Sequence, residues 1–589
     1  MIDPHADNTP PTRSANAWFR HALFKRRALF IDGAVAALTI NCIALATSFY
    51  SMQVYDRVLP SMGYATLWVM TVGVLLAIAL ELGMRHLRAR LVERACKAMD
   101  EELSSVFFGH ALAIRMDCRP HTVGTFAAQI RQFEMVRNFL TSTTMFVLAD
   151  APFALLFVGV MALIAGPLAL VPLVLLVLAV LTGLMFRTPL ARRAEAQIAE
   201  SNQKNGLLIE AIDGIESVKA AGAEWKLLDR WRRLTRRLAD NEVAIRDLSN
   251  LSTQLAQTLQ QLAYVGLVAV GAHAIGAGNL TIGGLIACTI ISGRALGPIA
   301  QLPGLIVQWQ HARFALRGLD QIMALPTDSP PRESRMVPGS CQGRLRLDGL
   351  RFAWGPDAPA LAIDRLVVQP GERVAVLGAV GSGKSTFMKL LSGLYRPAGG
   401  RVFLDDVDMA QLAPEFLREH IGYLPQDVRL FQGSLRDNLT LGLAALSDDQ
   451  ILAAARLTGL DRVIAAHPRG LGLEISEGGR GLSGGQRQLA GLTWLLLARP
   501  RVMLLDEPTA AMDPQLEERL AADLFGQCPA GTSLIVVTHK PALLRHFTRI
   551  VVLDRGRLVA DGPRDDVARR LRDAALGPAQ PPKFLSEAS

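Results

Sequence analysis

The sequence predicts an α-helical membrane domain with six spans, followed by an α/β domain. Six apolar runs in the first part of the chain approach the roughly 20 residues that cross a bilayer. A polar, proline-rich stretch follows them. Beyond it, apolar strand-like runs alternate with helical patterns, which is typical of a mostly parallel sheet covered by helices.

The six apolar runs define the membrane domain. We place them at residues 29–50, 64–84, 141–164, 167–187, 254–275 and 280–305. Tight, uncharged turns at 165–167 and 276–279 contrast with the long basic stretches before the third and fifth runs. Because Lys and Arg collect on the cytoplasmic side of membrane proteins, this asymmetry predicts that both termini are cytoplasmic. One or two such runs would fit a soluble core, but six with this charge pattern favour a membrane.

The composition excludes some classes of function. Half of the 589 residues are hydrophobic, and the formal net charge is +9. No basic-aromatic motif accompanies the basic residues, so membrane topology explains this charge better than nucleic-acid binding does. The six cysteines lack metal-ligand spacing, and the polar first 20 residues predict no cleavable signal peptide. We therefore expect reduced thiols and a first span that stays in the mature chain.

Changes in composition set the predicted domain boundaries. The linker is polar and rich in proline, and the tail is rich in Ala, Pro and Ser, which is typical of disorder. We predict a cytoplasmic N-terminal arm (1–28), a membrane domain (29–325), a linker (326–342), an α/β domain (343–573) and a disordered tail (574–589).

A glycine-rich loop in the α/β domain has the features of a phosphate-binding site. It lies between a strand-like run at 374–377 and a helical run at 387–391. Glycines let backbone N–H groups turn toward phosphates, Lys384 reaches the β- and γ-phosphates, and Ser385 offers a hydroxyl to Mg²⁺. The helix N-terminus adds its positive dipole end. The residues predicted to bind a nucleotide are Gly378, Ala379, Val380, Gly381, Ser382, Gly383, Lys384, Ser385 and Thr386.

A second motif makes this prediction more specific. Residues 482–486 read Leu-Ser-Gly-Gly-Gln and begin an apolar helix. With the glycine-rich loop before it, this signature makes residues 340–570 resemble the ATP-binding cassette (ABC) ATPases. The resemblance implies that ATP and Mg²⁺ are the cofactors. It also implies that the signature binds the γ-phosphate held by an opposite subunit, through Ser483, Gly484, Gly485 and Gln486.

Two carboxylates end a predicted buried strand. The apolar residues 502–505 lead straight into Asp506 and Glu507. In P-loop enzymes the first acid helps to hold Mg²⁺. The resemblance implies that the second acid polarises the attacking water as a general base. The alternative is an acidic pair that caps the next helix, which the apolar run before it disfavours.

The resemblance assigns three further residues by their place in the order of motifs. Gln426, in Tyr-Leu-Pro-Gln-Asp, matches a glutamine that touches Mg²⁺ and contacts the membrane domain. His539, in Thr-His-Lys, matches the histidine that contacts the γ-phosphate, although a lone histidine after a strand is usually structural. Trp354 matches the aromatic residue that stacks on adenine, and Phe352 is the competing candidate.

One chain carries one phosphate loop and one signature. A complete site in this family needs both, from two cassettes that face head to tail, so the resemblance implies a dimer. No site residue is degenerate, which favours a homodimer with two active sites, while a heterodimer is the alternative. Asp513, in Ala-Ala-Met-Asp, aligns with the D-loop and implies communication between the two sites.

Motifs outside the ATPase set indicate the cargo. Ser-Met-Gln-Val-Tyr-Asp-Arg-Val-Leu-Pro at 51–60, Ser-Gly-Arg-Ala-Leu-Gly-Pro at 292–298 and Asp-Val-Arg-Leu-Phe at 427–431 resemble segments of bacterial type I secretion exporters. This resemblance implies an inner-membrane exporter of an unfolded polypeptide. Its expected partners are a periplasmic adaptor and an outer-membrane channel.

Two other functions remain open at this point. One is an ABC exporter of lipid, peptide or drug without periplasmic partners. The other is a channel or regulator that the cassettes gate, which the intact Glu507 and His539 disfavour. We expect no N-terminal peptidase domain, because only a short arm without cysteine precedes the first span.

Arg294 lies inside the sixth apolar run. An arginine in a span costs about 2.5–3.5 kcal/mol on insertion scales, so such residues usually face a cavity or a partner. Arg294 either lines a polar translocation path, pairs with Glu81 or Asp150, or lies close enough to the interface to extend into it.

Overall fold

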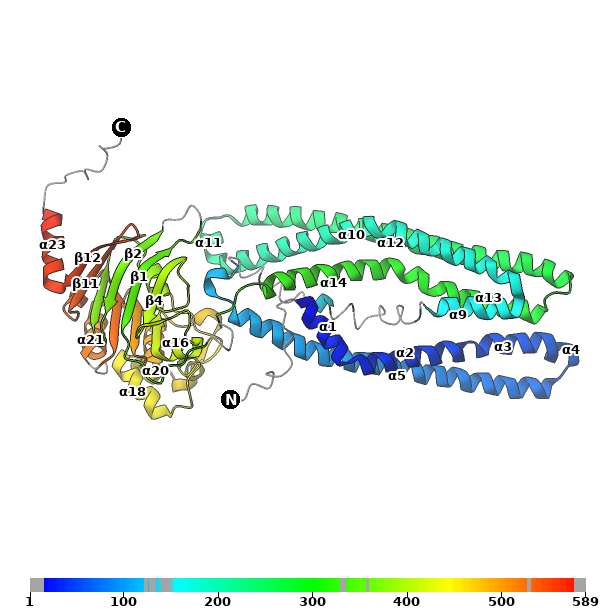
Figure 1. Ribbon diagram of the computed structural model, residues 1–589, viewed down its shortest axis with the longest axis horizontal. Coiled ribbons are helices and arrows are strands. Elements are labelled where there is room, and N and C mark those ends of the chain that lie inside the picture. The colour runs from blue at the N-terminus through cyan, green and yellow to red at the C-terminus, as the bar shows by residue number, and fades with distance from the viewer. Residues whose placement is uncertain are drawn as a thin grey trace, which may run out of the picture. The chain divides into compact units, whose positions relative to one another are not determined.

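The computed structural model describes residues 15–120, 126, 134–136, 139, 150, 152–328, 335–355, 360–526 and 531–576. The chain divides into two units (Figure 1). The first holds Met1–Leu112 and Pro120–Leu325, and the second holds Ala113–Arg119 and Pro326–Ser589. Ala113–Arg119 joins the second unit because Ile114 forms an isolated bridge with Thr327. The residue-level domain boundaries given above remain a prediction.

The first unit is a bundle of long helices (Figure 1). Its α-helices are α1 (Ala15–Lys25), α2 (Arg27–Ala44), α3 (Ala46–Gln53), α4 (Leu59–Ser61), α5 (Tyr64–Ala113), α9 (Phe153–Ala165), α10 (Leu170–Asp213), α11 (Ile215–Ala220), α12 (Glu224–Gly276), α13 (Ile282–Leu296) and α14 (Leu302–Met323). A π-helical segment, η1 (Val54–Val58), and two 3-10 segments, η3 (Gly166–Ala169) and η4 (Gly297–Gln301), join some of them.

The helices of this bundle account for the predicted spans. Among the described residues, five helical stretches are long and apolar enough to cross a membrane. One of them, Phe153–Asp213, is broken at Gly166 and holds the fourth predicted run together with the end of the third. The first part of the third run lies outside the described residues. The sixth run is not one helix, because Gly297 and Pro298 break it between α13 and α14.

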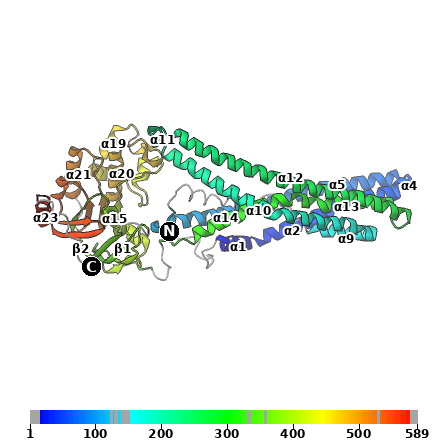
Figure 2. The ribbon, with the colours of Figure 1, turned by 90° about the horizontal axis from the view of Figure 1, so that it is seen from above.

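The short turns of the bundle lie together at one end (Figures 1 and 2). The Asp56 carboxylate in η1 accepts hydrogen bonds from the Thr281 hydroxyl (2.7 Å) and the Gly283 N–H (2.8 Å). A carboxylate at a helix N-terminus is stabilised by the helix dipole. A side chain at position 283 would lie 2.3 Å from the Met52 carbonyl oxygen, so only glycine fits this approach.

The core of the bundle mixes large and small side chains. Phe157 and Met161 of α9 pack with Leu176 of α10, Ala263 of α12 and Ile291 of α13. Small residues let membrane helices approach closely, and larger ones fill the space that remains.

The second unit contains a ten-stranded sheet with helices around it (Figure 1). Its strands are β1 (Leu345–Phe352), β2 (Leu361–Val368), β3 (Arg373–Leu377), β4 (Gly399–Leu404), β5 (Val407–Asp408), β6 (Ile421–Leu424), β9 (Val502–Asp506), β10 (Ser533–Val537), β11 (Arg549–Asp554) and β12 (Arg557–Pro563), and β7 (Gly433–Ser434) pairs separately with β8 (Glu474–Ile475). Its helices are α15 (Lys384–Leu391), α16 (Pro414–His420), α17 (Leu435–Leu439), α18 (Asp448–Thr458), α19 (Asp461–Ala466), α20 (Gly484–Ala498), α21 (Pro514–Gly526), α22 (Pro541–Leu544) and α23 (Arg564–Leu576).

The sheet is mixed, which corrects the expectation of a mostly parallel one. The strand order is β5-β4-β1-β2-β12-β11-β3-β10-β9-β6. The run from β11 to β6 is parallel, while β5-β4-β1-β2 and the β11-β12 pair are antiparallel. The turn from β11 to β12 is short and has positive φ angles at Arg555 (44°) and Gly556 (76°). A tight turn of this kind forms an antiparallel hairpin and leaves no room for a crossover helix.

The parallel part of the sheet positions the predicted site. Strands β3, β10 and β9 are direct neighbours. The glycine-rich loop, His539 and the acidic pair lie at or just after their carboxyl ends. Ligands of open α/β sheets bind at this edge.

Candidate nucleotide-binding and hydrolysis site

The loop between β3 and α15 has a backbone that requires glycine. Gly378, Gly381 and Gly383 have φ angles of 154°, 81° and 95°. A side chain at position 378 would lie 2.2 Å from the Leu553 carbonyl oxygen. No side chain covers the backbone at these glycines, so the N–H groups of the loop can approach a phosphate. Val380 at its tip is 96% exposed.

Lys384 begins α15 and reaches back across the loop. Its Nζ donates to the carbonyl oxygens of Gly378 and Ala379, both at 2.9 Å. The side chain is buried, and this desolvation lowers the pKa of Lys384, while the nearby Glu507 and Asp506 act in the opposite direction. The backbone carbonyls of the loop thus hold the ammonium group in place.

Ser385 and Asp506 form the predicted metal-binding pair. Asp506 ends β9, is 2% exposed and accepts a hydrogen bond from the Ser385 side chain. Burial raises the pKa of Asp506, and this hydrogen bond opposes the increase. A hydroxyl and a carboxylate side by side are oxygen ligands that suit Mg²⁺, and a cation would offset the cost of burying the charge.

Glu507 lies between the two other residues that the sequence assigns to hydrolysis. Its Oε2 accepts from Nε2 of Gln426 at 2.9 Å, and its Oε1 lies 3.0 Å from Nε2 of His539. Its backbone has a φ of 49°, which is uncommon for a residue other than glycine. The Glu507 N–H donates to the Val537 carbonyl, which fixes this turn against the end of β10.

Gln488 is a site residue that the sequence analysis missed. It is 4% exposed, and its Nε2 lies 3.4 Å from the Gln426 carbonyl and 3.3 Å from the Glu507 carbonyl. Its Oε1 accepts from the Ala511 N–H at 3.3 Å. One amide thus joins two loops of the site, the one after β6 and the one after β9. The available signal was a second glutamine, two residues beyond the signature on the same helix.

An aromatic cluster lies beside the phosphate loop. The Trp354 ring contacts Phe352 and Tyr395 edge to face, at 5.3 and 5.2 Å between centroids. Its Nε1 donates to the Thr386 hydroxyl at 3.1 Å. Trp354 is 47% exposed, whereas Phe352 is 7% exposed. Of the two candidates, Trp354 therefore has an exposed ring on which adenine can stack, and the buried Phe352 ring packs against Trp354.

The signature forms the N-terminus of α20 in a fixed turn. The Ser483 hydroxyl accepts from the Gln486 N–H (3.2 Å), and the Gln486 side chain accepts from the Ser483 N–H (2.9 Å). This reciprocal pair is a capping box. Gly485 lies against the backbone of Ala511, where a side chain would meet the carbonyl oxygen at 2.8 Å. Asp513 caps α21 through the Leu516 N–H at 2.9 Å.

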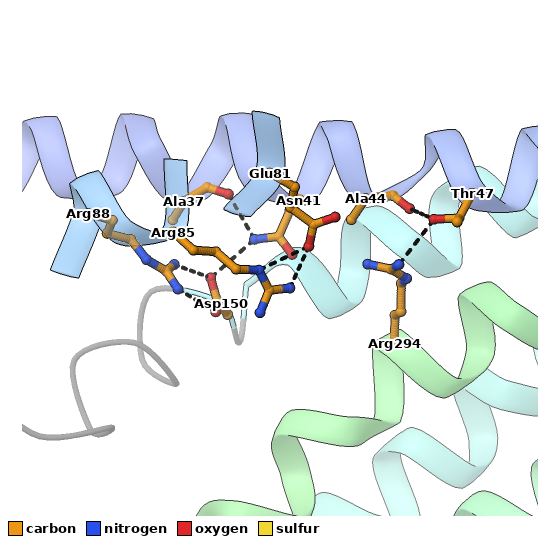
Figure 3. A network of polar contacts seen from close by, with 9 residues as sticks. All are labelled: Ala37, Asn41, Ala44, Thr47, Glu81, Arg85, Arg88, Asp150 and Arg294. Carbon is orange, nitrogen blue, oxygen red and sulfur yellow. Dashed lines mark hydrogen bonds and ion pairs between the residues drawn. The ribbon is translucent and has the colours of Figure 1, made fainter. Parts of the chain in front are cut away.

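Polar side chains inside the helical bundle form a separate group (Figure 3). Asp150 accepts from Arg88 (2.8 Å) and Asn41 (3.1 Å), and Glu81 pairs with a neighbouring arginine on α5. Arg294 donates instead to the Thr47 hydroxyl at 3.2 Å. The proposed pairing of Arg294 with Glu81 or Asp150 is therefore wrong, because both carboxylates bind arginines of α5.

Two family models match the chain. One describes the ABC transporter transmembrane region and matches residues 29–298, and the other describes the ABC transporter and matches residues 363–510. Together they cover both units.

Curated relatives match most of the chain. The toxin RTX-I translocation ATP-binding protein of Actinobacillus pleuropneumoniae and the leukotoxin translocation ATP-binding protein LktB of Mannheimia glucosida are each 29% identical over 93% of this chain and 78% of their own length. The exotoxin translocation ATP-binding protein PaxB of Pasteurella aerogenes is 28% identical over 93% of this chain and 77% of its own.

A solved structure shares the fold. The structure of a bacterial Atm1-family ABC exporter with ATP bound superposes with a TM-score of 0.84 at 22% identity. The match covers 95% of this chain and 99% of that one.

Proposed function

This chain belongs to the ABC transporters, with the membrane domain and the ATPase cassette of an exporter, and from this premise we propose that it drives type I secretion of an unfolded polypeptide. It hydrolyses ATP, and the hydrolysis is coupled to transport. One observation carries the proposal: the similarity to toxin translocation proteins runs over 93% of the chain and so includes the membrane domain, which meets the cargo.

We assign the nucleotide to the loop between β3 and α15. In this proposal the loop N–H groups and Lys384 hold the phosphates, and the exposed face of Trp354 stacks on adenine. Ser385, Gln426 and Asp506 would hold Mg²⁺, which when bound neutralises charge on the phosphate oxygens. The hydrogen bond between the Ser385 and Asp506 side chains supports this assignment.

Glu507 is the proposed general base. It accepts a proton from the attacking water, so that the oxygen can reach the γ-phosphorus. Gln426 and His539 each bind one carboxylate oxygen and thereby fix its orientation. The strained backbone of Glu507 is consistent with a function, because such strain persists where the surrounding structure over-determines it.

Two copies of the chain complete the site in our proposal. Each copy supplies its own phosphate loop and presents its signature, including Ser483 and Gly485, to the nucleotide of the other. The N–H groups at the start of α20 suit an anion. Asp513 would then link the two sites, although within one chain it acts as a helix cap.

We place the exporter in the bacterial inner membrane with both termini in the cytoplasm. The basic stretches between apolar runs support this orientation. The proposed partners are a periplasmic adaptor, an outer-membrane channel and the secreted polypeptide.

Comparison of secreted proteins tests the proposal. Cells with the native gene and cells with Glu507→Gln are grown alike, and the proteins in their media are compared. We expect one polypeptide to disappear from the medium of the variant. An unchanged set of secreted proteins, with normal ATP hydrolysis by the purified native protein, would overturn secretion in favour of a lipid or drug cargo.

A further inference from the structure

A row of amide side chains runs along one face of α12. Asn250, Gln254, Gln257 and Gln261 follow one another at spacings of four, three and four residues, which places them on one side of a helix. All four are exposed, and none has a hydrogen-bond partner among the residues that the structure describes. Thr258 lies beside them, and its hydroxyl donates a hydrogen bond to the backbone carbonyl of Gln254. We call the four asparagine and glutamine residues the amide row.

The amide row reaches into the membrane part of α12. Gln261 lies about 22 Å from the end of α12 at Gly276, at 1.5 Å of rise per residue, so it falls within a hydrocarbon layer of about 30 Å. Farther along the same face the exposed side chains become apolar, as Val265 (60%) and Val268 (38%) show. Among the described residues, this stretch has the lowest hydropathy of the five candidate spans.

A neighbouring helix shows what a lipid-facing surface looks like at the same depth. Met185 lies about 22 Å from the start of α10 at Leu170, as far from the turns of the bundle as Gln261 is. The exposed side chains between it and the turns are apolar, including Leu181 (55%), Leu184 (53%) and Met185 itself (65%), and the exposed polar residues Arg187 and Thr188 begin only beyond it. An unpaired amide in hydrocarbon is strongly unfavourable, because it loses its hydrogen bonds with water and gains none. The face of α12 that carries the amide row therefore does not fit lipid.

Packing against another helix does not fit the amide row either. Membrane helices pack through small residues that let their backbones approach. The opposite face of α12 contains such residues, since Ser252, Ala256 and Ala263 are buried there together with Leu259 and Leu267. Asparagine and glutamine can also hydrogen-bond across helices, but no described residue bonds these four side chains, so they suit a wider space that contains water.

We infer that the amide row lines the export path and binds the backbone of an extended polypeptide. Each backbone unit of an unfolded chain carries one N–H donor and one C=O acceptor. A glutamine or asparagine amide carries both complementary groups. Uncharged amides bind any sequence in this way without selecting the charge of its side chains. The inference rests on the proposed function, because it names the chemical group of that cargo which the path recognises.

Photocrosslinking tests the inference in the full chain. The photoreactive residue p-benzoyl-phenylalanine replaces Gln257 or Gln261 in one set of cells and Met185, as the matched control, in another. We expect both α12 positions to form adducts with the same polypeptide that disappears from the medium of Glu507→Gln cells, and Met185 to form none. Adducts of the α12 positions with lipid, or with a second copy of the exporter, would overturn the inference.

Substitution supplies a second readout. The triple variant Gln254→Leu, Gln257→Leu, Gln261→Leu should reach the membrane in normal amount and secrete at least tenfold less. The control Leu262→Met, Val265→Leu, Val268→Leu changes three exposed apolar residues of the same helix and should secrete normally. Normal secretion by the triple leucine variant would contradict binding by the amide row. If no polypeptide is lost from Glu507→Gln medium, both proposals fail; if one is lost but does not crosslink, only this inference fails.

Discussion

Oε1 of Glu507 lies 3.0 Å from Nε2 of His539, and these two residues follow neighbouring parallel strands. The other carboxylate oxygen accepts from Gln426, so both oxygens of Glu507 are fixed by side chains from different loops. Such an arrangement would position the base that we propose before its substrate arrives, and preorganisation of this kind is the main source of catalysis in phosphoryl transfer.

Removal of the Glu507 charge should stop hydrolysis but leave ATP binding intact. The variant Glu507→Gln keeps the size of the side chain and removes the base, and we expect turnover to fall about 10²–10⁴-fold. Phosphate release and ATP binding by the purified chain measure the two effects. The control Glu518→Gln changes an exposed glutamate of α21 and should hydrolyse normally. Full turnover by Glu507→Gln would assign the base to another residue.

Loss of the Gln488 amide should weaken hydrolysis through its neighbours. Gln488→Leu removes the contacts with the Gln426 and Glu507 carbonyls and with the Ala511 N–H, each worth about 0.5–1.5 kcal/mol. We expect turnover to fall about tenfold, with little change in ATP affinity, because these contacts are with Gln426, Glu507 and Ala511 and not with the glycine-rich loop. Gln488→Glu keeps the acceptor for Ala511 and should have an intermediate rate. A change confined to ATP affinity would contradict this positioning role.

The stability of the chain without nucleotide should depend on the charge of Asp506. Burial raises the pKa of Asp506 above that of the unfolded chain, so folding favours the protonated acid. The free energy of folding that the protonated Asp506 contributes is complete at acid pH and is lost as the pH rises through the folded-state pKa. We expect Asp506→Asn, which is neutral throughout, to melt at a higher temperature than the native chain at neutral pH.

The pH series provides the control for this prediction. The difference in melting temperature should shrink as the pH falls toward about 4, where an ordinary aspartate protonates. Thermal unfolding of both proteins without Mg²⁺ or nucleotide measures it. Equal melting at neutral pH, or a difference that grows on acidification, would show that burial of the charge does not destabilise this site.

The Arg88–Asp150 pair should stabilise the helical bundle only while both partners are present. Arg88 has 8% of its side chain exposed, so Arg88→Met leaves the Asp150 charge with the hydrogen bond from Asn41 that Figure 3 shows. Removal of one partner of a buried pair costs about 3–5 kcal/mol. The double variant Arg88→Met, Asp150→Leu should recover most of that loss. Thermal unfolding in detergent measures both, and a double variant less stable than Arg88→Met would contradict the prediction.

Local patterns predicted the spans and the loop of the nucleotide site. A run of apolar residues or the order Gly-Ser-Gly-Lys-Ser is contained in a short window, so the chemistry that it requires can be inferred without knowledge of distant contacts. The positions of β3, β9 and β10 and the start of α15 beside Lys384 agree with that inference. The roles of the site residues remain predictions.

Contacts between distant segments could not be predicted in this way. Arg294 donates to Thr47, which lies 247 residues earlier, whereas the sequence analysis offered only Glu81 and Asp150 as its partners. Gln488 bridges loops that are separate in the sequence, so its role depends on the folded sheet. The antiparallel strands were not predicted, because a pattern of alternating strands and helices does not reveal short hairpins such as β11–β12.

The capping box of the signature has a consequence for the speed of dimer closure. Ordering a flexible residue costs about 1–2 kcal/mol of conformational entropy, and a free glycine-rich loop would lose it on each encounter. Since Ser483 and Gln486 already hold the turn within one chain, little of this entropy remains to be lost. Two copies that meet with ATP in place can therefore close at a rate set by their diffusion and orientation in the membrane plane, not by the folding of a loop.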